Sequence, residues 1–219
     1  QQYAMVYLNI VQFQRYKVVY GWNNGQKLLV SIAGALSQCV KGKGEVCAKA
    51  DGDHFAILLS GEEEDVEEKV KKVKAFVEEQ IYRDTGNRAE IQMGVYYIPQ
   101  SSTDLRGAVV CASQAIDFME KGDGSIKVYD DSIEKSVKDR HEREQLLDSV
   151  EIEGNFATYY QAKVDVKTEK IVGAEALVRF LDPTEKGAVK SPGFFVPYYE
   201  QTGRVTEIDF FVLRCVCRM

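Results

Sequence analysis

Two short apolar runs, residues 46–50 and 55–59, are separated by the four residues Asp51-Gly52-Asp53-His54. An Asp-Gly pair between apolar runs is typical of a tight hairpin turn, because glycine readily takes the positive φ that such turns require. The sequence therefore predicts a pair of antiparallel strands at this point. An isolated hairpin is barely stable in water, so we expect the neighbouring sequence to supply further strands and covering helices.

The hydrophobic pattern on both sides of this hairpin predicts those elements. Apolar residues recur at helical spacing over residues 24–40, 62–80 and 104–119. Strand-like segments occupy residues 4–13, 90–97 and 126–129. The resulting order is strand, helix, hairpin, helix, strand, helix, strand. It indicates the α+β class, with helices packed on one sheet that contains antiparallel strands.

A second structural unit is expected after this sheet. Residues 131–150 form a predicted polar helix with few apolar positions, which we interpret as a connector. Two strands are expected over 157–164 and 171–180, followed by a loop and helical segments to the end of the chain. We therefore expect a first domain over 1–130, a connecting helix over 131–153 and a second segment over 154–219.

The composition indicates which class of partner and which cellular compartment to expect. The formal net charge is -6 and no basic tail or patch is present, which argues against a nucleic-acid partner. The five cysteines form no CxxC pair, so reduced thiols in a cytoplasmic protein are expected rather than a zinc site. The chain opens on a strand and ends on a helix, so we interpret it as a fragment. Its parent would carry a sensor upstream, or a membrane attachment.

Residues 8–29 and the turn at Asp51-Gly52-Asp53-His54-Phe55 resemble the GGDEF family, the diguanylate cyclases. Phe13, Gly21 and Gly25 fall on landmarks of that family, and so does Gly94 after a later strand. The resemblance implies the family's five-stranded, ferredoxin-like sheet of the nucleotidyl-cyclase palm type.

The same resemblance implies that the first domain has lost its chemistry. The family's metal-binding, guanine-reading and signature positions carry Asn9, Val11, Lys17, Gln26, Asp51 and His54. Asn9 replaces a carboxylate metal ligand by a neutral amide, and only Asp53 survives as a weak candidate metal ligand. The family's inhibitory product site falls on Gly42 and Glu45, without its arginine. We expect no cyclase activity, and we interpret His54 as a turn residue rather than a ligand.

Residues 156–219 resemble the opening of an EAL domain, the cyclic-di-GMP phosphodiesterase family. The motif Glu175-Ala176-Leu177-Val178-Arg179 is intact, residues 191–197 match the loop that follows it, and Ala162 departs from the usual Gln-Pro. The resemblance implies a strand pair and helices from an incomplete TIM-like barrel. It also implies that Glu175 binds Mg²⁺ or Mn²⁺ and that Gln161 and Arg179 contact cyclic-di-GMP. From the residues alone, a salt-bridged Glu175–Arg179 pair at a strand end is the alternative.

The leading expectation is a bacterial cyclic-di-GMP signalling protein. Its inactive GGDEF domain would regulate or dimerise a parent EAL phosphodiesterase, with GTP as a further regulator. This fragment is itself expected to be inactive and to bind no metal tightly, because the family's other ligands and catalytic lysine lie on later strands. A non-catalytic receptor or scaffold is the alternative, and an active diguanylate cyclase is a third. We also expect the apolar side chains of Tyr198, Tyr199 and residues 210–213 to need cover from the first domain or another chain.

Overall fold

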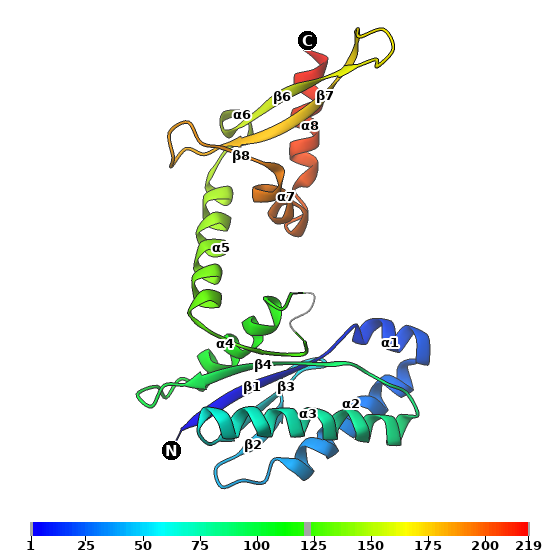
Figure 1. Cartoon of the computed structure of the whole chain (residues 1–219), viewed down its shortest axis with the longest axis vertical. Helices are drawn as coiled ribbons and strands as arrows, with labels where there is room; N and C mark the ends of the chain where they lie inside the picture. The colour runs from blue at the N-terminus through cyan, green and yellow to red at the C-terminus, as the bar shows by residue number, and fades with distance from the viewer. Residues whose placement is uncertain (1, 121–123, 219) are drawn as a thin grey trace. The chain divides into compact units, whose positions relative to one another are not determined.

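A computed structural model describes residues 2–120 and 124–218 of the chain. The chain divides into two compact units, Gln1–Ser136 and Val137–Met219. Within the described residues, no helix combines the length and the apolar character that a membrane crossing requires. Each unit is built on its own sheet, and Figure 1 shows their elements.

A five-stranded sheet forms the centre of the first unit. Its strands are β1 (Tyr3–Ile10), β2 (Val46–Lys49), β3 (Phe55–Ser60), β4 (Ile91–Ile98) and β5 (Ile126–Val128), in the order β2-β3-β1-β4-β5. The pairs β2–β3, β3–β1 and β1–β4 are antiparallel, and β4–β5 is parallel. The predicted hairpin is confirmed, because β2 and β3 pair in antiparallel register from Val46↔Leu58 to Lys49↔Phe55.

Helices cover both faces of this sheet. They are α1 (Phe13–Tyr20), α2 (Trp22–Cys39), α3 (Glu63–Thr85) and α4 (Leu105–Asp117). Alternate residues of β1 point to opposite faces. Val6 and Leu8 belong to the buried cluster that includes α2 and α3, whereas Met5 packs with α4. The predicted packing of helices on the sheet is confirmed, and the structure adds that they cover both of its faces (Figure 1).

Helix α1 is an element that the sequence pattern did not predict. The strand expected over residues 4–13 ends at Ile10, and Phe13 instead begins α1 and is buried. The chain changes direction at Gln12, whose φ of 52° and ψ of 41° place it in the left-handed region. A non-glycine residue seldom takes this conformation. The amino-acid sequence around Gln12 therefore gave no reason to predict a turn there.

The second unit has a smaller sheet with one covered face. Its elements are α6 (Ile152–Asn155), β6 (Phe156–Val164), β7 (Ile171–Leu181), β8 (Val189–Lys190), α7 (Pro192–Gln201) and α8 (Val205–Cys217). The three strands are antiparallel in the order β6-β7-β8. We expected only a strand pair. The third strand forms because the loop after β7 folds back, with the Asp182 amide donating to the Ala188 carbonyl at 3.1 Å.

An aromatic core holds this unit together. Phe156, Phe180, Phe195 and Tyr199 are buried with Leu147, which lies near the end of helix α5 (Asp131–Ser149). The expectation that Tyr199 and Phe211 need cover from elsewhere is wrong, because both are buried within this unit. Phe210 and Leu213 on α8 remain 60% and 56% exposed. Helix α5 carries a residue of this core, and the predicted boundaries at 130 and 153 stay predictions.

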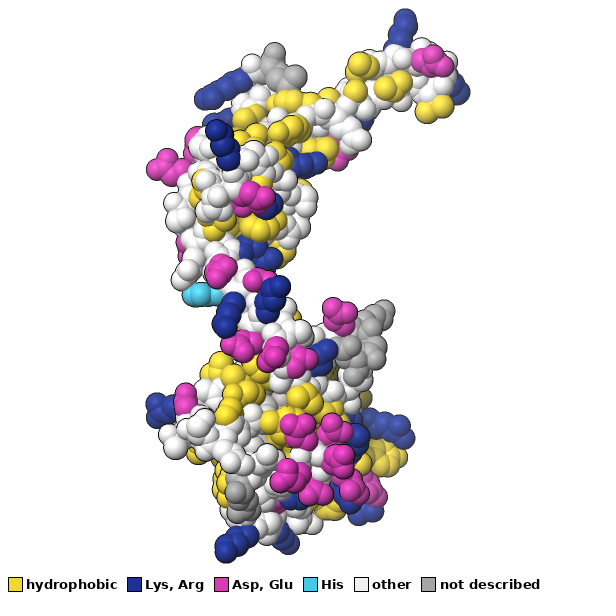
Figure 2. Space-filling view, turned by 60° about the vertical axis from the view of Figure 1, so that its left-hand side comes forward, with side chains coloured by type: hydrophobic (Ala, Val, Ile, Leu, Met, Phe, Trp, Pro, Cys, Tyr) yellow, Lys and Arg dark blue, Asp and Glu magenta, His cyan; other side chains and the backbone are white. Residues whose placement is uncertain are grey.

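The two units expose different kinds of side chain on the surfaces that Figure 2 shows. Acidic side chains gather on one face of the first unit, and hydrophobic side chains are visible on the hairpin of the second unit (Figure 2). The hairpin residues Val166, Ile171 and Val172 are 94%, 71% and 69% exposed.

Candidate functional site

The turn between β2 and β3 is held by contacts between its own substituted residues. His54 Nδ1 lies 2.9 Å from Asp51 Oδ1, and the Tyr7 hydroxyl of β1 donates to the same oxygen at 3.4 Å. The Tyr7 ring stacks on the His54 ring with centroids 5.1 Å apart. The His54 imidazole therefore contacts the turn and β1, and its role as a turn residue stays a prediction.

Tyr7 is a residue that the sequence pattern did not single out. Partial burial, followed by the charge of Asp51 and the hydrogen bond to it, raises the pKa of Tyr7 from 10.0 to about 12. A tyrosine phenol is protonated at neutral pH in any case, and the raised pKa extends its ability to donate to Asp51 to more alkaline pH. Its position two residues before Asn9 on β1 was the available signal, since such residues share a face of a strand.

The turn offers few charged oxygen donors for a divalent cation, and one of them, Asp51, already contacts His54 and Tyr7. Asn9 offers a neutral amide, and Asp53 is the one carboxylate retained from the pattern. Across the described ranges, no three His, Cys, Asp or Glu side chains come close enough to hold a metal ion. Divalent Mg²⁺ and Ca²⁺ prefer several oxygen ligands with negative charge among them. Asp53 as a metal ligand stays a prediction.

The two positions predicted to have lost guanine recognition lie on neighbouring helices. Lys17 Nζ sits 4.8 Å from the ring centroids of both Phe13 and Trp22, so its charge faces two aromatic rings. Gln26 is exposed on α2. Neither side chain is a bidentate acceptor for a base.

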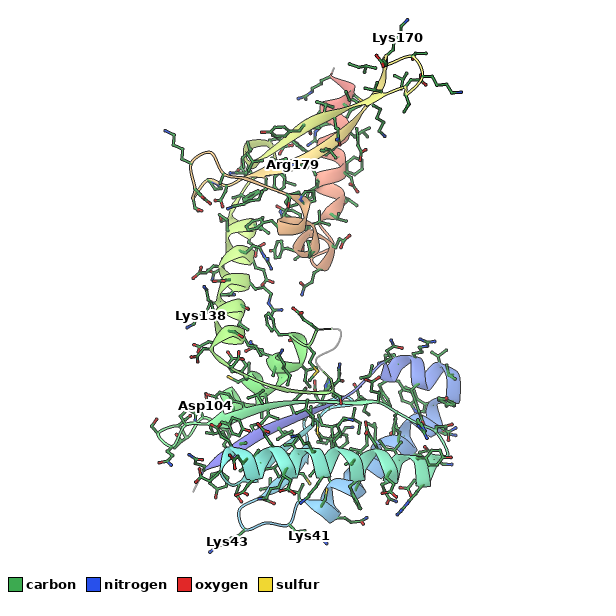
Figure 3. All side chains as sticks on the ribbon, viewed as in Figure 1. Lys41, Lys43, Asp104, Lys138, Lys170 and Arg179 are labelled. Carbon is green, nitrogen blue, oxygen red and sulfur yellow. The ribbon has the colours of Figure 1, made fainter. Side chains whose placement is uncertain are left out.

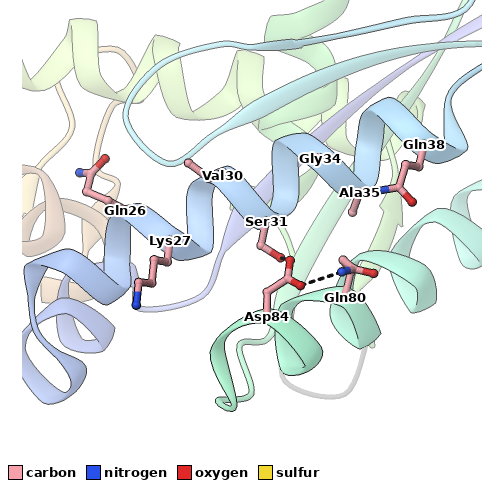
Figure 4. Close-up of a pocket in the computed structure, with 9 residues that line it drawn as sticks. All are labelled: Gln26, Lys27, Val30, Ser31, Gly34, Ala35, Gln38, Gln80 and Asp84. Carbon is pink, nitrogen blue, oxygen red and sulfur yellow. Dashed lines mark hydrogen bonds between the residues drawn. The ribbon is translucent and has the colours of Figure 1, made fainter.

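Gln26 also lines one end of a hollow between α2 and α3 (Figure 4). The hollow has a volume of about 520 Å³. Asp84 accepts hydrogen bonds from Ser31 and Gln80, each at 2.8 Å, and Ser31 is buried. These polar groups satisfy one another and tie α2 to α3, so we assign the hollow a structural role.

Gly42 and Glu45, which occupy the positions of the family's inhibitory product site, also have a structural role. The Glu45 side chain is only 4% exposed and pairs with Lys69 at 2.6 Å. It accepts hydrogen bonds from the Gly42 amide at 2.9 Å and from the Ser60 amide at 3.3 Å. Glu45 thus joins the loop before β2 to the end of β3 and to α3.

The second candidate site lies on the hairpin of β6 and β7. In the antiparallel register Gln161 is directly opposite Glu175, and Arg179 is opposite Ala157. Side chains alternate along a strand, so Glu175 and Arg179 lie on one face of β7, and Gln161 joins them from β6. Phe180 and Phe156 occupy the other face, in the core. All three predicted residues are therefore brought to one face, opposite the core side of the sheet; Figure 3 labels Arg179.

Within this face, Glu175 and Arg179 do not pair with each other. A strand rises about 3.4 Å per residue, so positions four apart are separated by about 14 Å. Glu175 Oε2 instead lies 3.6 Å from Lys163 Nζ, and Arg179 Nη1 donates to the Val178 carbonyl at 2.8 Å. The alternative of a Glu175–Arg179 salt bridge is wrong. The sequence could not exclude it, because the partners of these long side chains depend on the register between β6 and β7.

Residues 1–123 match the family model described as "Diguanylate cyclase, GGDEF domain". The chain belongs to the GGDEF family. A second family model, the EAL domain, matches residues 143–219, so this GGDEF chain continues into EAL sequence. The GGDEF landmark Gly94 lies on β4 against α4, where a side chain has no room.

Curated relatives align with the whole of this chain. The signaling protein YkoW of Bacillus subtilis is 26% identical over 231 positions, covering 100% of this chain and 28% of YkoW. The bifunctional diguanylate cyclase/cyclic di-GMP phosphodiesterase MucR of Pseudomonas aeruginosa is 23% identical, covering 100% of this chain and 32% of MucR. The chain spans less than a third of either relative.

Solved GGDEF domains share the fold of the first unit. The active GGEEF domain of a diguanylate cyclase from Vibrio cholerae aligns with a TM-score of 0.52 at 15% identity, covering 59% of this chain and 84% of that one. The GGDEF domain of TpbB (YfiN) from Pseudomonas aeruginosa aligns with a TM-score of 0.51 at 16% identity, covering 63% and 83%. The predicted palm-type sheet is thereby confirmed.

Proposed function

We propose that the protein carrying this chain acts in cyclic-di-GMP signalling. Its EAL domain hydrolyses the dinucleotide, and its GGDEF domain is a regulatory module without cyclase activity. The observation that carries the proposal is the common face of Gln161, Glu175 and Arg179 on β6 and β7. The hydrolysis is supported by the EAL match over residues 143–219 and by the name of MucR, which includes a cyclic di-GMP phosphodiesterase. The name of MucR also includes a diguanylate cyclase, so the absence of cyclase activity rests on Asn9 and the other changed positions of this chain.

The chemistry of the face suits this role. The Arg179 guanidinium can clamp phosphate oxygens, and the Gln161 amide can donate and accept hydrogen bonds. The Glu175 carboxylate and the facing Gln161 amide oxygen are hard donors, so they fit Mg²⁺ or Mn²⁺ as part of a larger ligand set. When bound, such an ion would activate water for attack on a phosphodiester. The ion held by Glu175 and the guanidinium of Arg179 would contact different parts of one dinucleotide.

The first test addresses hydrolysis in the full-length protein. We expect Glu175→Ala to abolish conversion of cyclic-di-GMP to the linear dinucleotide, because the carboxylate ligand is removed. Product formation is measured by chromatography, with the exposed Glu200→Ala as the matched control. Undiminished hydrolysis in Glu175→Ala would remove Glu175 from the site. Binding of cyclic-di-GMP without hydrolysis in the unmodified protein would favour the receptor or scaffold alternative.

The second test addresses the GGDEF domain. We expect no cyclic dinucleotide when the chain is incubated with GTP and Mg²⁺, because Asn9 lacks the charge of a carboxylate ligand. Each lost first-shell charge weakens binding of a divalent cation. Measurable turnover would refute the regulatory assignment and favour an active cyclase.

A further inference from the structure

An ion pair on the hairpin carries an inference beyond the hydrolysis itself. Lys163 on β6 is opposite Gly173, and Glu175 on β7 is opposite Gln161, so Lys163 and Glu175 are diagonal neighbours on one face. Gly173 has no side chain, and its surroundings are open. Lys163 therefore meets no side chain directly across the pair and leans along the strands to Glu175, where Nζ and Oε2 are 3.6 Å apart.

The contact occupies part of the carboxylate that the proposed function needs. Only Oε2 of Glu175 pairs with Lys163, and the Glu175 side chain is 54% exposed. The Lys163 ammonium group repels an incoming divalent cation and competes with it for oxygen.

We propose that Lys163 is a positioning residue that holds Glu175 when no metal is bound and sets the metal concentration at which the site fills. The inference rests on the proposed role of Glu175 as a ligand. Metal binding would require the Lys163 ammonium to withdraw along the open space beside Gly173. Lys163 would contribute no ligand, because an ammonium group has no acceptor.

The experiment is a calorimetric titration of the full-length protein with Mn²⁺ alone, without nucleotide. The variant Lys163→Met removes the charge and keeps an unbranched stem. We expect it to tighten Mn²⁺ binding about three- to ten-fold, because an exposed ion pair and a cation–cation repulsion are both removed. Lys163→Arg keeps the charge and should stay within about two-fold of the unmodified protein.

Two controls isolate the local effect. Lys170→Met removes a charge near the tip of the same hairpin (Figure 3) and should leave Mn²⁺ binding within about two-fold. Glu175→Gln identifies the part of the Mn²⁺ signal that belongs to this site. In about 1 M NaCl the advantage of Lys163→Met should shrink toward unity, because salt screens the repulsion. A purely structural role of Lys163 would not respond to salt in this way.

The outcomes separate this inference from the proposed function. The inference is supported if Lys163→Met binds Mn²⁺ more tightly than the unmodified protein and Lys163→Arg does not. Unchanged or weaker binding in Lys163→Met, with Mn²⁺ binding still lost in Glu175→Gln, overturns the inference and leaves Glu175 as a ligand. Mn²⁺ binding that is identical in Glu175→Gln and the unmodified protein overturns both.

Discussion

At the scale of single residues, the positions where the family motif has changed are reused for structure. Glu45 is the clearest case. Burial alone would raise the pKa of Glu45, but the hydrogen bond from Lys69, with those from the Ser60 and Gly42 amides, holds it below the usual value. A charged side chain this buried is stable because its oxygens are paired. Glu45 therefore stabilises the first unit.

Replacing Glu45 tests this role. Glu45→Gln should lower the free energy of unfolding by about 1–2 kcal/mol at neutral pH, because charged hydrogen bonds are lost. The depressed pKa means that the stabilisation is present above the unfolded pKa of about 4.3 and disappears as pH falls through the folded value. Denaturant titrations across acidic pH measure it, with the exposed Glu67→Gln as control. An equal loss in both variants would contradict the role.

Tyr7 gives a prediction at alkaline pH. Its folded pKa is raised from 10.0 to about 12, so its stabilising contribution is complete below pH 10 and declines up to about pH 12. In Tyr7→Phe, the free energy of unfolding should therefore fall less between pH 10 and about pH 12 than it does in the unmodified protein. The measurement is thermal unfolding of both proteins over this range. The exposed Tyr160→Phe is the control, and a decline that persists unchanged in Tyr7→Phe would disprove the assignment.

At the scale of elements, periodicity predicted most of the first unit, and local backbone conformation accounts for the main omission. The valines of α3 repeat at helical spacing, and β4 alternates, so both were found within a few residues of their ends. Helix α1 was missed because it depends on the left-handed conformation of Gln12. Helix α3 extends beyond the predicted Gln80 to Thr85, where Gly86 takes a φ of 70° and ends it.

In the candidate sites, the sequence predicted the motif residues but not the contacts that they make across strands. Motif positions located Gln161, Glu175 and Arg179, and strand alternation explains their common face. Lys163 was not singled out, because its contact depends on the register between β6 and β7. Tyr7 was missed because its partner Asp51 lies 44 residues away in sequence. Pairings across strands require the register, which a single sequence does not contain.

The close approach of β4 and α4 makes an element-scale prediction. A Cβ added at Gly94 would lie 1.9 Å from the Ala112 carbonyl oxygen, which is backbone and cannot rotate away. Gly94→Ala should therefore lower the free energy of unfolding by about 3 kcal/mol, because the helix must shift. Chemical denaturation measures it. Gly173→Ala on β7, with open space around it, is the matched control, and comparable stability of the two variants would refute the packing argument.

At the scale of the whole molecule, the buried residues fall into separate cores. The main cluster of the first unit gathers residues from β1, β3 and β4 with α2 and α3, and the second gathers aromatic residues around Phe195. Among the described residues these clusters share no member. Each unit should then have its own stability, as cooperative units of a chain commonly do.

Phe195 tests this separation. Phe195 is fully buried, so Phe195→Leu should destabilise the second unit by about 1–2 kcal/mol through lost packing. Hydrogen exchange measured by mass spectrometry should show faster exchange in β6, β7 and α7, with unchanged protection in β1 and β4. Faster exchange in both units would show that they unfold together.

The fixed rise of strand β7 has a consequence for inhibitor design. No rotamer change can bring the backbone positions of Glu175 and Arg179 together, since the spacing of about 14 Å is a property of extended chain. In the proposed site, the ion held by Glu175 and the guanidinium of Arg179 would therefore occupy separate places along β7. We expect a phosphodiester long enough to reach both to compete better for the site than a short one that reaches only one of them.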